Sequence, residues 1–359
     1  MTVFLFVSGL ALLIIGAEAL VRGATKIASG LGISPLIIGL TIVAFGTSSP
    51  ELAVSIKAGV SGQADIAVGN VVGSNIFNVL FILGLSALIV PLYVSQQLIK
   101  LDVPLMIGLS LVTLLIALDQ HISRIDGLLL VTGLIVYILV LVYMGIRNVN
   151  DTDKPDKNTI TENNSTRIGN WPLNVILVVG GLTLLVIGSR WFVNSAVTIA
   201  NYFGISEVII GLTIVAAGTS MPEVVTSIVA AIRNERDIAV GNVVGSNIFN
   251  IMGVLGISSI VAPAGIDVTE AIIGFDIPIM TAVAVACLPI FFSGGKISRW
   301  EGGLFLGYYV AYTLYLVLDA TGHDSLPLFN DIMFYFVIPL TVITIIIIAI
   351  RELRPEDKS

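Results

Sequence analysis

The sequence predicts an all-α polytopic membrane protein, built from two inverted five-helix repeats and one extra C-terminal transmembrane helix. Three observations support this fold class: the composition, eleven long apolar segments and an internal duplication. Of the 359 residues, 56% are hydrophobic and 11% are charged, whereas an average globular protein has about 45–50% and about 25%. Together with a mean hydropathy of +1.02, this composition excludes a soluble enzyme, a disordered chain and a coiled coil.

The charge and cysteine content exclude two further classes. The chain has 17 basic and 24 acidic residues, for a net charge of −7, and nucleic-acid binding requires clustered Lys and Arg. We therefore expect no nucleic-acid partner. The single cysteine, Cys287, lies in an apolar run, so no disulfide within the chain can form.

Eleven segments are long and apolar enough to span a bilayer, which takes about 20 residues of helix. Pro50 and Pro222 interrupt the second and the seventh segment. The eleven segments lie near residues 3–24, 36–58, 66–90, 101–118, 126–146, 172–195, 207–231, 238–261, 271–292, 301–319 and 332–350.

The distribution of Lys and Arg predicts the orientation. With the N terminus outside, only Lys57, Arg124 and Arg190 of the 17 basic residues remain on the outer side. Because cytoplasmic loops carry an excess of Lys and Arg, this arrangement predicts an outer N terminus and a cytoplasmic C terminus. The hydrophilic stretch 147–170 is then a cytoplasmic linker.

The duplication relates Ser34–Pro91 to Ser206–Pro263 at a constant offset of 172 residues, with 35 identities in 58 positions. Each copy belongs to a unit of five spans, an odd number, so the copies must cross the membrane in opposite directions. Inverted repeats are typical of transporters with a site near the bilayer midplane. We expect repeats at 1–146 and 171–320, separated by the linker, and an extra span with a cytoplasmic tail at 321–359.

Two glutamates lie in the middle of predicted spans, in the related motifs GTSSPE and GTSMPE. A carboxylate at this depth is costly, and no Lys or Arg lies at a comparable depth in the repeats. Glu51 and Glu223 are therefore expected to bind a cation or a proton.

The proline before each glutamate strengthens this interpretation. Pro50 and Pro222 remove a helical hydrogen bond from the carbonyls of Gly46 and Gly218. Such irregular backbone is tolerated at membrane depth where it faces protein or a hydrated cavity. If the helical spacing persists, neighbouring hydroxyls share a face with the carboxylates. These hydroxyls belong to Thr47, Ser48, Thr219 and Ser220.

A second polar cluster, Asp65–Asn78, is identical to Asp237–Asn250. Its Gly-x-x-x-Gly spacing is typical of close helix packing, and Asn70, Ser74 and Asn78 recur at every fourth residue. These polar groups suit either helix–helix hydrogen bonds or ion binding. The better ligand candidates are Ser74, Asn78, Ser246 and Asn250.

All these candidates offer oxygen, which disfavours zinc and copper, whereas Ca²⁺ takes 6–8 oxygen ligands. Two carboxylates neutralise one Ca²⁺, and without it they would take up protons or Na⁺. No G-x-x-x-x-G-K-[ST] motif is present, so we expect no nucleotide and no cofactor, and an ion gradient as the energy source.

The two glutamate motifs, each followed by GNVVGSNIFN, resemble the two α-repeats of the Na⁺/Ca²⁺ exchangers of the cation/Ca²⁺ exchanger superfamily. The resemblance implies ten helices in two inverted halves, a short pair of gating helices sliding against the core, and exchange of one Ca²⁺ for several Na⁺. It also implies a prokaryotic-type antiporter of the inner or plasma membrane, surrounded by lipid. The ligands implied are Ala44, Thr47, Ser48, Glu51, Ser74, Asn78, Ala216, Thr219, Ser220, Glu223, Ser246 and Asn250.

Other functions remain open at this point. Ca²⁺/H⁺ exchange ranks second, and K⁺ coupling is disfavoured because potassium-dependent relatives carry Asp where this chain has Asn250. A cation channel would not need an inverted duplication. An enzyme is not expected, since no nucleophile–base pair accompanies the carboxylates. Glu18 and Arg190, at the same repeat position, are expected at the membrane interface, and the last span is expected to be peripheral.

Overall fold

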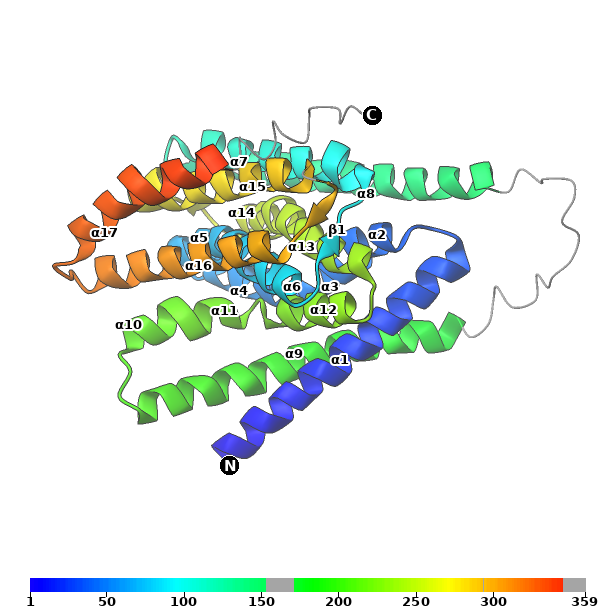
Figure 1. Ribbon diagram of the computed structural model, residues 1–359, viewed down its shortest axis with the longest axis horizontal. Helices are drawn as coiled ribbons and strands as arrows, with labels where there is room; N and C mark the ends of the chain where they lie inside the picture. Colours follow the sequence, from blue (N-terminus) through cyan, green and yellow to red (C-terminus); the bar gives the residue numbers. More distant parts are fainter. Residues whose placement is uncertain (153–170, 293, 345–359) are drawn as a thin grey trace, which may run out of the picture.

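The computed structural model describes residues 1–152, 171–292 and 294–344 and is almost entirely helical there (Figure 1). Within these residues, nine helices are long and apolar enough to cross a membrane. Two bent helix pairs bring the number of spans to eleven. As far as the described residues reach, all eleven predicted spans are mainly helical, which confirms the all-α polytopic fold class.

The first half contains five spans. Its helices, with π-helical segments written η and strands written β, are α1 (Thr2–Leu31), α2 (Pro35–Ile38), η1 (Gly39–Val43), α3 (Ala44–Thr47), α4 (Ser49–Val60), α5 (Ala64–Phe77), η2 (Asn78–Leu83), α6 (Gly84–Ile89), β1 (Leu92–Tyr93), η3 (Leu98–Asp102), α7 (Val103–Ala117), β2 (His121–Ile122) and α8 (Arg124–Thr152).

The second half repeats this order. Its elements are α9 (Trp171–Tyr202), α10 (Glu207–Ile210), η4 (Gly211–Val215), α11 (Ala216–Gly218), α12 (Met221–Ile232), α13 (Arg236–Phe249), η5 (Asn250–Leu255), α14 (Gly256–Val261), β3 (Ile266–Asp267), η6 (Ile272–Asp276), α15 (Ile277–Phe292), β4 (Lys296–Ile297) and α16 (Arg299–Ala320). The last span follows as α17 (Leu326–Ile332) and η7 (Met333–Val337).

The second and seventh spans are broken in the middle. The chain bends by 46° between α3 and α4 and by 64° between α11 and α12. Pro50 and Pro222 stand in the first turns of α4 and α12. A proline is tolerated there because its missing N–H has no partner in a first turn. The sequence thus starts a new helix at the point where each glutamate follows.

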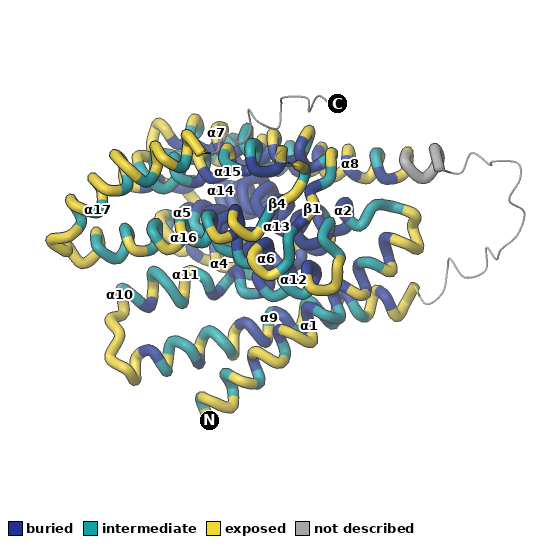
Figure 2. Tube along the Cα trace, viewed as in Figure 1, coloured by how far each residue is buried: buried dark blue, intermediate teal, exposed yellow. Residues whose placement is uncertain are grey.

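The core of the bundle is formed by two spans, α5–α6 and α13–α14. They are the most buried of the spanning helices in the described residues, and Figure 2 shows them as the dark centre of the molecule. Each contains a π-helical segment that begins at an asparagine, Asn78 in η2 and Asn250 in η5. Short π-helical insertions occur frequently at functional sites.

Two long helices, α1 and α9, cross along one side of the bundle (Figure 1). Glycines let their backbones touch: a Cβ built on Gly16 would lie 2.8 Å from the carbonyl oxygen of Gly181, and one built on Gly181 would lie 2.7 Å from that of Gly16. Gly9 and Gly188 form the same kind of contact seven residues away. Because these contacts tolerate no side chain, α1 and α9 form a tightly joined pair.

Short strands join the two halves at both ends of the bundle. At one end, β1 pairs antiparallel with β4, and at the other, β2 pairs antiparallel with β3. Since each pair joins a loop of the first half to a loop of the second, the halves are linked at both ends. The repeats therefore interlock instead of standing side by side as separate units.

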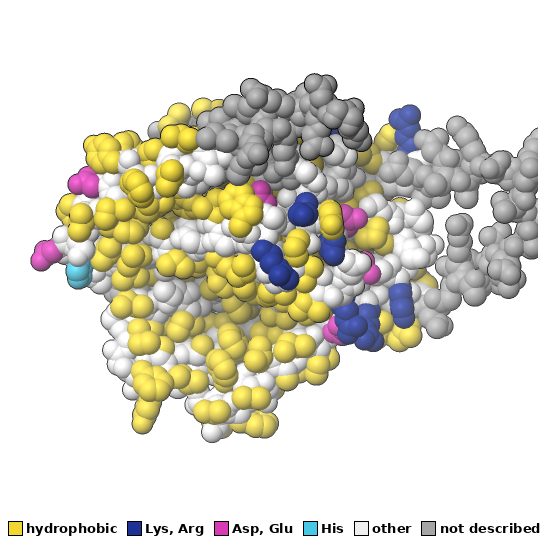
Figure 3. All heavy atoms as spheres, in the orientation of Figure 1, with side chains coloured by type: hydrophobic (Ala, Val, Ile, Leu, Met, Phe, Trp, Pro, Cys, Tyr) yellow, Lys and Arg dark blue, Asp and Glu magenta, His cyan; other side chains and the backbone are white. Residues whose placement is uncertain are grey.

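The β1–β4 end carries basic side chains. The Arg236 guanidinium lies 4.7 Å from the centre of the Tyr93 ring, and Arg299 donates to the carbonyl of Ile89. Figure 3 shows Lys and Arg gathered toward the right of that face. This clustering agrees with the predicted cytoplasmic end, although the orientation itself stays a prediction.

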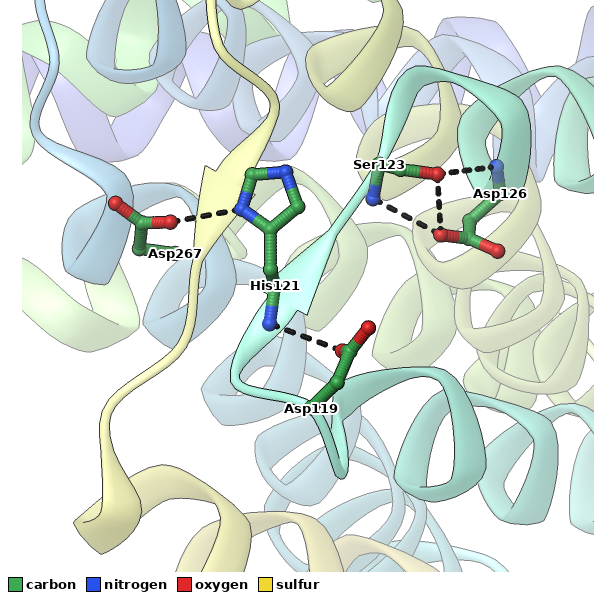
Figure 4. A network of polar contacts seen from close by, with 5 residues as sticks. All are labelled: Asp119, His121, Ser123, Asp126 and Asp267. Carbon is green, nitrogen blue, oxygen red and sulfur yellow. Dashed lines mark hydrogen bonds and ion pairs between the residues drawn. The ribbon is translucent and has the colours of Figure 1, made fainter.

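The β2–β3 end carries acidic side chains instead (Figure 4). His121 Nδ1 lies 2.8 Å from Asp267 Oδ1, across the strand pair. The backbone N–H of His121 donates to Asp119, and that of Ser123 donates to Asp126. These bonds fix the loop between α7 and α8, and they are exposed structural contacts.

Four boundaries differ clearly from the prediction. The helix α1 ends at Leu31 instead of 24, and α9 ends at Tyr202 instead of 195. The helix α8 continues to Thr152, so the predicted linker 147–170 begins with helix; its residues 153–170 lie outside the described part. The last span begins at Leu326, six residues before the predicted start at 332, because Pro327 is accommodated in the first turn of α17. The predicted tail beyond residue 344 also lies outside the described residues, and the domain boundaries stay a prediction.

The last span lies at the edge of the bundle, beside α16 (Figure 1). None of its most apolar window is buried. Between this span, α15 and α16 lies an apolar cavity of about 490 Å³, whose lining includes Tyr308 and Phe334. The weak packing agrees with the expectation that this span is peripheral.

Candidate cation-binding site

The two broken spans meet through their glutamates. Glu51 and Glu223 stand in the first turns of α4 and α12, and both are fully buried. Ser220 Oγ donates to Glu51 Oε1 at 2.8 Å, and Ser48 Oγ donates to Glu223 Oε1 at 3.0 Å. Each carboxylate is thus held by the serine that precedes the other helix. The inverted repeats thereby bring four predicted site residues together.

The threonines of the breaks point to the opposite repeat as well. Thr47 Oγ1 donates to Asn242 Oδ1 at 3.0 Å, and Thr219 Oγ1 donates to Asn70 Oδ1 at 3.4 Å. Asn70 in turn donates to the backbone carbonyl of Glu51 at 3.1 Å. The two asparagines are therefore supports of the breaks. The sequence left the role of these two asparagines open. Their place among the polar residues that recur at every fourth position in both copies could have indicated it.

The remaining candidates lie on α5, α13 and the breaks themselves. Ser74 Oγ lies 3.3 Å from Ser220 Oγ, which links it to the Glu51 side of the network. Asn78, Ser246 and Asn250 are all buried. The carbonyl of Ala44 accepts from the backbone N–H of Ser48 at 3.0 Å.

The alanine of the second repeat differs from that of the first. Ala44 is fully buried. Ala216 is exposed and makes none of the side-chain hydrogen bonds that join the other candidates. The structure therefore gathers eleven of the twelve predicted ligands around the two breaks by burial or hydrogen bonding, and leaves Ala216 at the surface.

Ten buried side-chain polar atoms in the described residues have no hydrogen-bond partner, and five of them belong to candidate ligands. These five are the second carboxylate oxygens of Glu51 and Glu223, the amide oxygens of Asn78 and Asn250, and the hydroxyl of Ser246. A buried polar atom without a partner is costly, and most such atoms in proteins are satisfied. All five belong to residues that the sequence selected as ligands. A bound cation would satisfy them together.

No basic side chain neutralises the two carboxylates. The ion pairs among the described residues join Glu18 to Arg22 and to Arg233, and His121 to Asp267. The described residues also contain no group of three or more His, Cys, Asp or Glu side chains that would hold a metal ion. The site therefore combines two carboxyl groups with neutral oxygens, which suits a hard cation and not a soft metal.

One carbonyl freed by a proline has a partner on α9. Ser189 Oγ donates to the carbonyl oxygen of Gly218 at 2.9 Å. The sequence predicted that Pro222 frees this carbonyl, and the structure shows that a neighbouring helix takes up the lost bond. The α1–α9 pair is thereby in contact with the break itself.

Two further carboxylates inside the spans went unnoticed in the sequence. Tyr137 Oη donates to Asp102 at 2.8 Å, and Tyr312 Oη donates to Asp276 at 2.8 Å. The pairs occupy corresponding places in the two halves, at the starts of the fourth and ninth spans. Neither pair hydrogen-bonds to Glu51 or Glu223 in the described part of the chain.

A family model described as sodium/calcium exchanger protein matches residues 1–143 and 173–318. The chain is a member of this family. CaxA of Alkalimonas amylolytica is 43% identical to this exchanger over 317 residues, which cover 87% of the present chain and 97% of CaxA. The sodium/calcium exchanger MaX1 of Methanosarcina acetivorans is 34% identical over 338 residues, covering 86% and 96%.

A solved structure has the same fold. The sodium–calcium exchanger NCX_Mj, soaked with Na⁺ and Ca²⁺, superposes on this exchanger with a TM-score of 0.72 at 32% identity. The match covers 86% of the present chain and 96% of NCX_Mj. The predicted family and fold class are therefore confirmed. The chain is a multi-pass membrane transporter and not an enzyme.

Proposed function

We propose that this exchanger carries Ca²⁺ in one direction and Na⁺ in the other, by alternating access to the site between Glu51 and Glu223. The observation that carries the proposal is a set of five buried, unpartnered oxygens, two from carboxylates that have no basic partner in the described residues and three from neutral side chains. Relatives named sodium/calcium exchangers support the choice of ions. The proposed ligands are those that the sequence selected, and the support for Ala216 is weakest because it is exposed.

Ca²⁺ and Na⁺ compete for the same oxygen ligands, and this competition couples the transport of the two ions. With Ca²⁺ bound, its two charges balance the two carboxylates, and Ca²⁺ accepts 6–8 oxygens in adaptable geometry. Once Ca²⁺ leaves, the two carboxylates repel each other, because they face each other through a medium of low dielectric constant. Na⁺ then replaces it, so that the charged site does not cross the membrane empty. No cofactor is needed, since the ion gradient supplies the free energy.

We assign the gating role to the α1–α9 pair. Its glycine contacts make it one unit, and it touches the break through Ser189. With 30 and 32 residues, these helices are the longest in the described part of the chain, whereas the resemblance implies a short gating pair. The inner membrane is the proposed location, supported by the 37% identical inner membrane protein YrbG of Escherichia coli.

The test is uptake of Ca²⁺ by liposomes that contain the purified full-length protein. Vesicles loaded with Na⁺ should accumulate external Ca²⁺, and the uptake should stop when the Na⁺ gradient is collapsed. The same assay is run with K⁺ and H⁺ gradients. Uptake driven only by a pH gradient would replace Na⁺ by H⁺ in this proposal, and flux independent of any opposing ion would indicate a channel.

A further inference from the structure

Four buried asparagines form a hydrogen-bond network between the two repeats. Asn78 Nδ2 donates to Asn247 Oδ1 at 2.9 Å, and Asn250 Nδ2 donates to Asn75 Oδ1 at 3.1 Å. All four side chains are 1–2% exposed. Asn75 and Asn247 were not among the candidate ligands, because they stand one residue off the stripe of Asn70, Ser74 and Asn78.

Asn75 and Asn247 are themselves fixed. Asn75 Nδ2 donates to the backbone carbonyl of Asn247 at 3.3 Å, and Asn247 Nδ2 donates to that of Asn75 at 3.3 Å. Their amide nitrogens also contact the sulfur atoms of Met280 and Met106. With its nitrogen held in this way, Asn75 presents its side-chain oxygen to Asn250 as an acceptor. Asn247 presents its side-chain oxygen to Asn78 in the same way.

An asparagine amide has two ends of nearly equal shape, one a donor and one an acceptor. If the side-chain amide turns by half a rotation, the oxygen that binds a cation is replaced by an N–H group that repels it. In Asn78 and Asn250 the nitrogen is occupied, and the oxygen is buried without a partner. The neighbouring acceptors thus select the orientation that suits a cation.

We infer that Asn75 and Asn247 are positioning residues, which hold the amide oxygens of Asn78 and Asn250 toward the transported cation. This inference rests on the proposed cation site. Without the acceptor at 75, the amide of Asn250 is free to turn its nitrogen inward, and the cation loses a ligand. A carboxylate at position 250 would need no such help, because both its ends are oxygen.

The experiment measures Ca²⁺ binding to the purified full-length protein in detergent by calorimetry. In Asn75→Leu and Asn247→Leu, the Kd for Ca²⁺ should rise about tenfold, the order expected when a buried hydrogen bond is lost. Asn75→Asp keeps an acceptor oxygen and should bind Ca²⁺ more tightly than Asn75→Leu. Thr113→Val, at a buried threonine of α7 whose hydroxyl donates to the carbonyl of Leu109, is the control and should leave the Kd unchanged.

A double-variant cycle separates orientation from mere packing. Adding Asn75→Leu to Asn250→Asp should change the Kd much less than adding it to the natural chain. Equal increases in both backgrounds, or no increase in the single Leu variants, would overturn the inference. Because binding is measured without a coupling ion, a protein that shows this pattern but no Na⁺-driven uptake would refute the proposed exchange and leave the positioning role standing.

Discussion

The two broken spans have the same design but not the same surroundings. On one side, α1 packs along α12, and Glu18 of α1 accepts from Arg233 at the end of α12. On the other side, α9 makes no comparable contact with α4 in the described part of the chain. Val54 of α4 is 38% exposed, whereas its repeat counterpart on α12, Thr226, is fully buried. Both glutamates are fully buried, but α12 is covered by α1 whereas the corresponding face of α4 is exposed at Val54.

The sequence contains the cause of this difference. Glu18 corresponds to Arg190 in the second repeat, and Arg233 corresponds to Ser61 in the first. The ion pair that joins α1 to α12 therefore has no counterpart between α9 and α4. In the proposed alternating-access cycle, the two states related by the inverted repeat would therefore differ in energy.

The largest effect on transport is expected at the glutamates, which both halves of the site share. Glu51→Gln and Glu223→Gln should each reduce Ca²⁺ exchange about thirtyfold or more, because removing one charge of a buried carboxylate–cation pair costs about 2–5 kcal/mol. The measurement is Na⁺-driven uptake in liposomes. Glu270→Gln, at an exposed loop position, is the control and should exchange normally. Normal transport by either site variant would remove the glutamates from the mechanism.

The next largest effect is expected from the difference in exposure between Val54 and Thr226. Val54→Cys and Thr226→Cys place a thiol at corresponding positions, and the single natural cysteine, Cys287, is buried and gives little background. A membrane-impermeant thiol reagent should modify Val54→Cys from the side of the β2–β3 loops. Thr226→Cys should be protected from both sides. Equal modification of both positions would show that the halves are equivalent in the membrane.

A smaller effect is expected from the ion pair itself. Glu18 and Arg233 are partly exposed, and such pairs contribute about 0.2–1 kcal/mol. Glu18→Gln should therefore raise modification of Thr226→Cys by at most about fivefold. Arg22→Gln, which removes a partner on α1 itself, should change it less. A larger effect of Arg22→Gln would show that Arg233 does not hold α1 in place.

The smallest effect is expected at the last span. A chain that stops after Gly322 contains both repeats, and the removed helix has no buried window against the bundle. We expect Na⁺-driven Ca²⁺ uptake close to that of the full chain. Complete loss of uptake in a truncated protein that remains folded, judged by gel filtration, would give the last span an essential role.

The duplication made most of the fold predictable from the sequence. An exact offset of 172 residues fixed the correspondence of spans, and the prolines located both breaks. The end of α8 was not predictable, since Arg147–Thr152 are polar but continue a helix. The start of the last span was missed because Leu326-Pro327 looks like a loop.

The site was predictable where both copies carry the same unusual polar residue at membrane depth, as with Glu51 and Glu223. What could not be predicted are contacts across the repeats. Asn247 holds Asn78 although 169 residues separate them, and Tyr137 reaches Asp102 from another span. Such pairs depend on how helices cross, which no spacing within one helix reveals. The exposure of Ala216 has the same origin, because symmetry in sequence did not guarantee symmetry in packing.

The strand pairs at both ends of the bundle bear on biogenesis. During synthesis the first five spans enter the bilayer alone, with β1 and β2 lacking their partners β4 and β3. Glu51 then also lacks Ser220. The two strand pairs and the bond between Ser220 and Glu51 can therefore form only after the second half of the chain has been made.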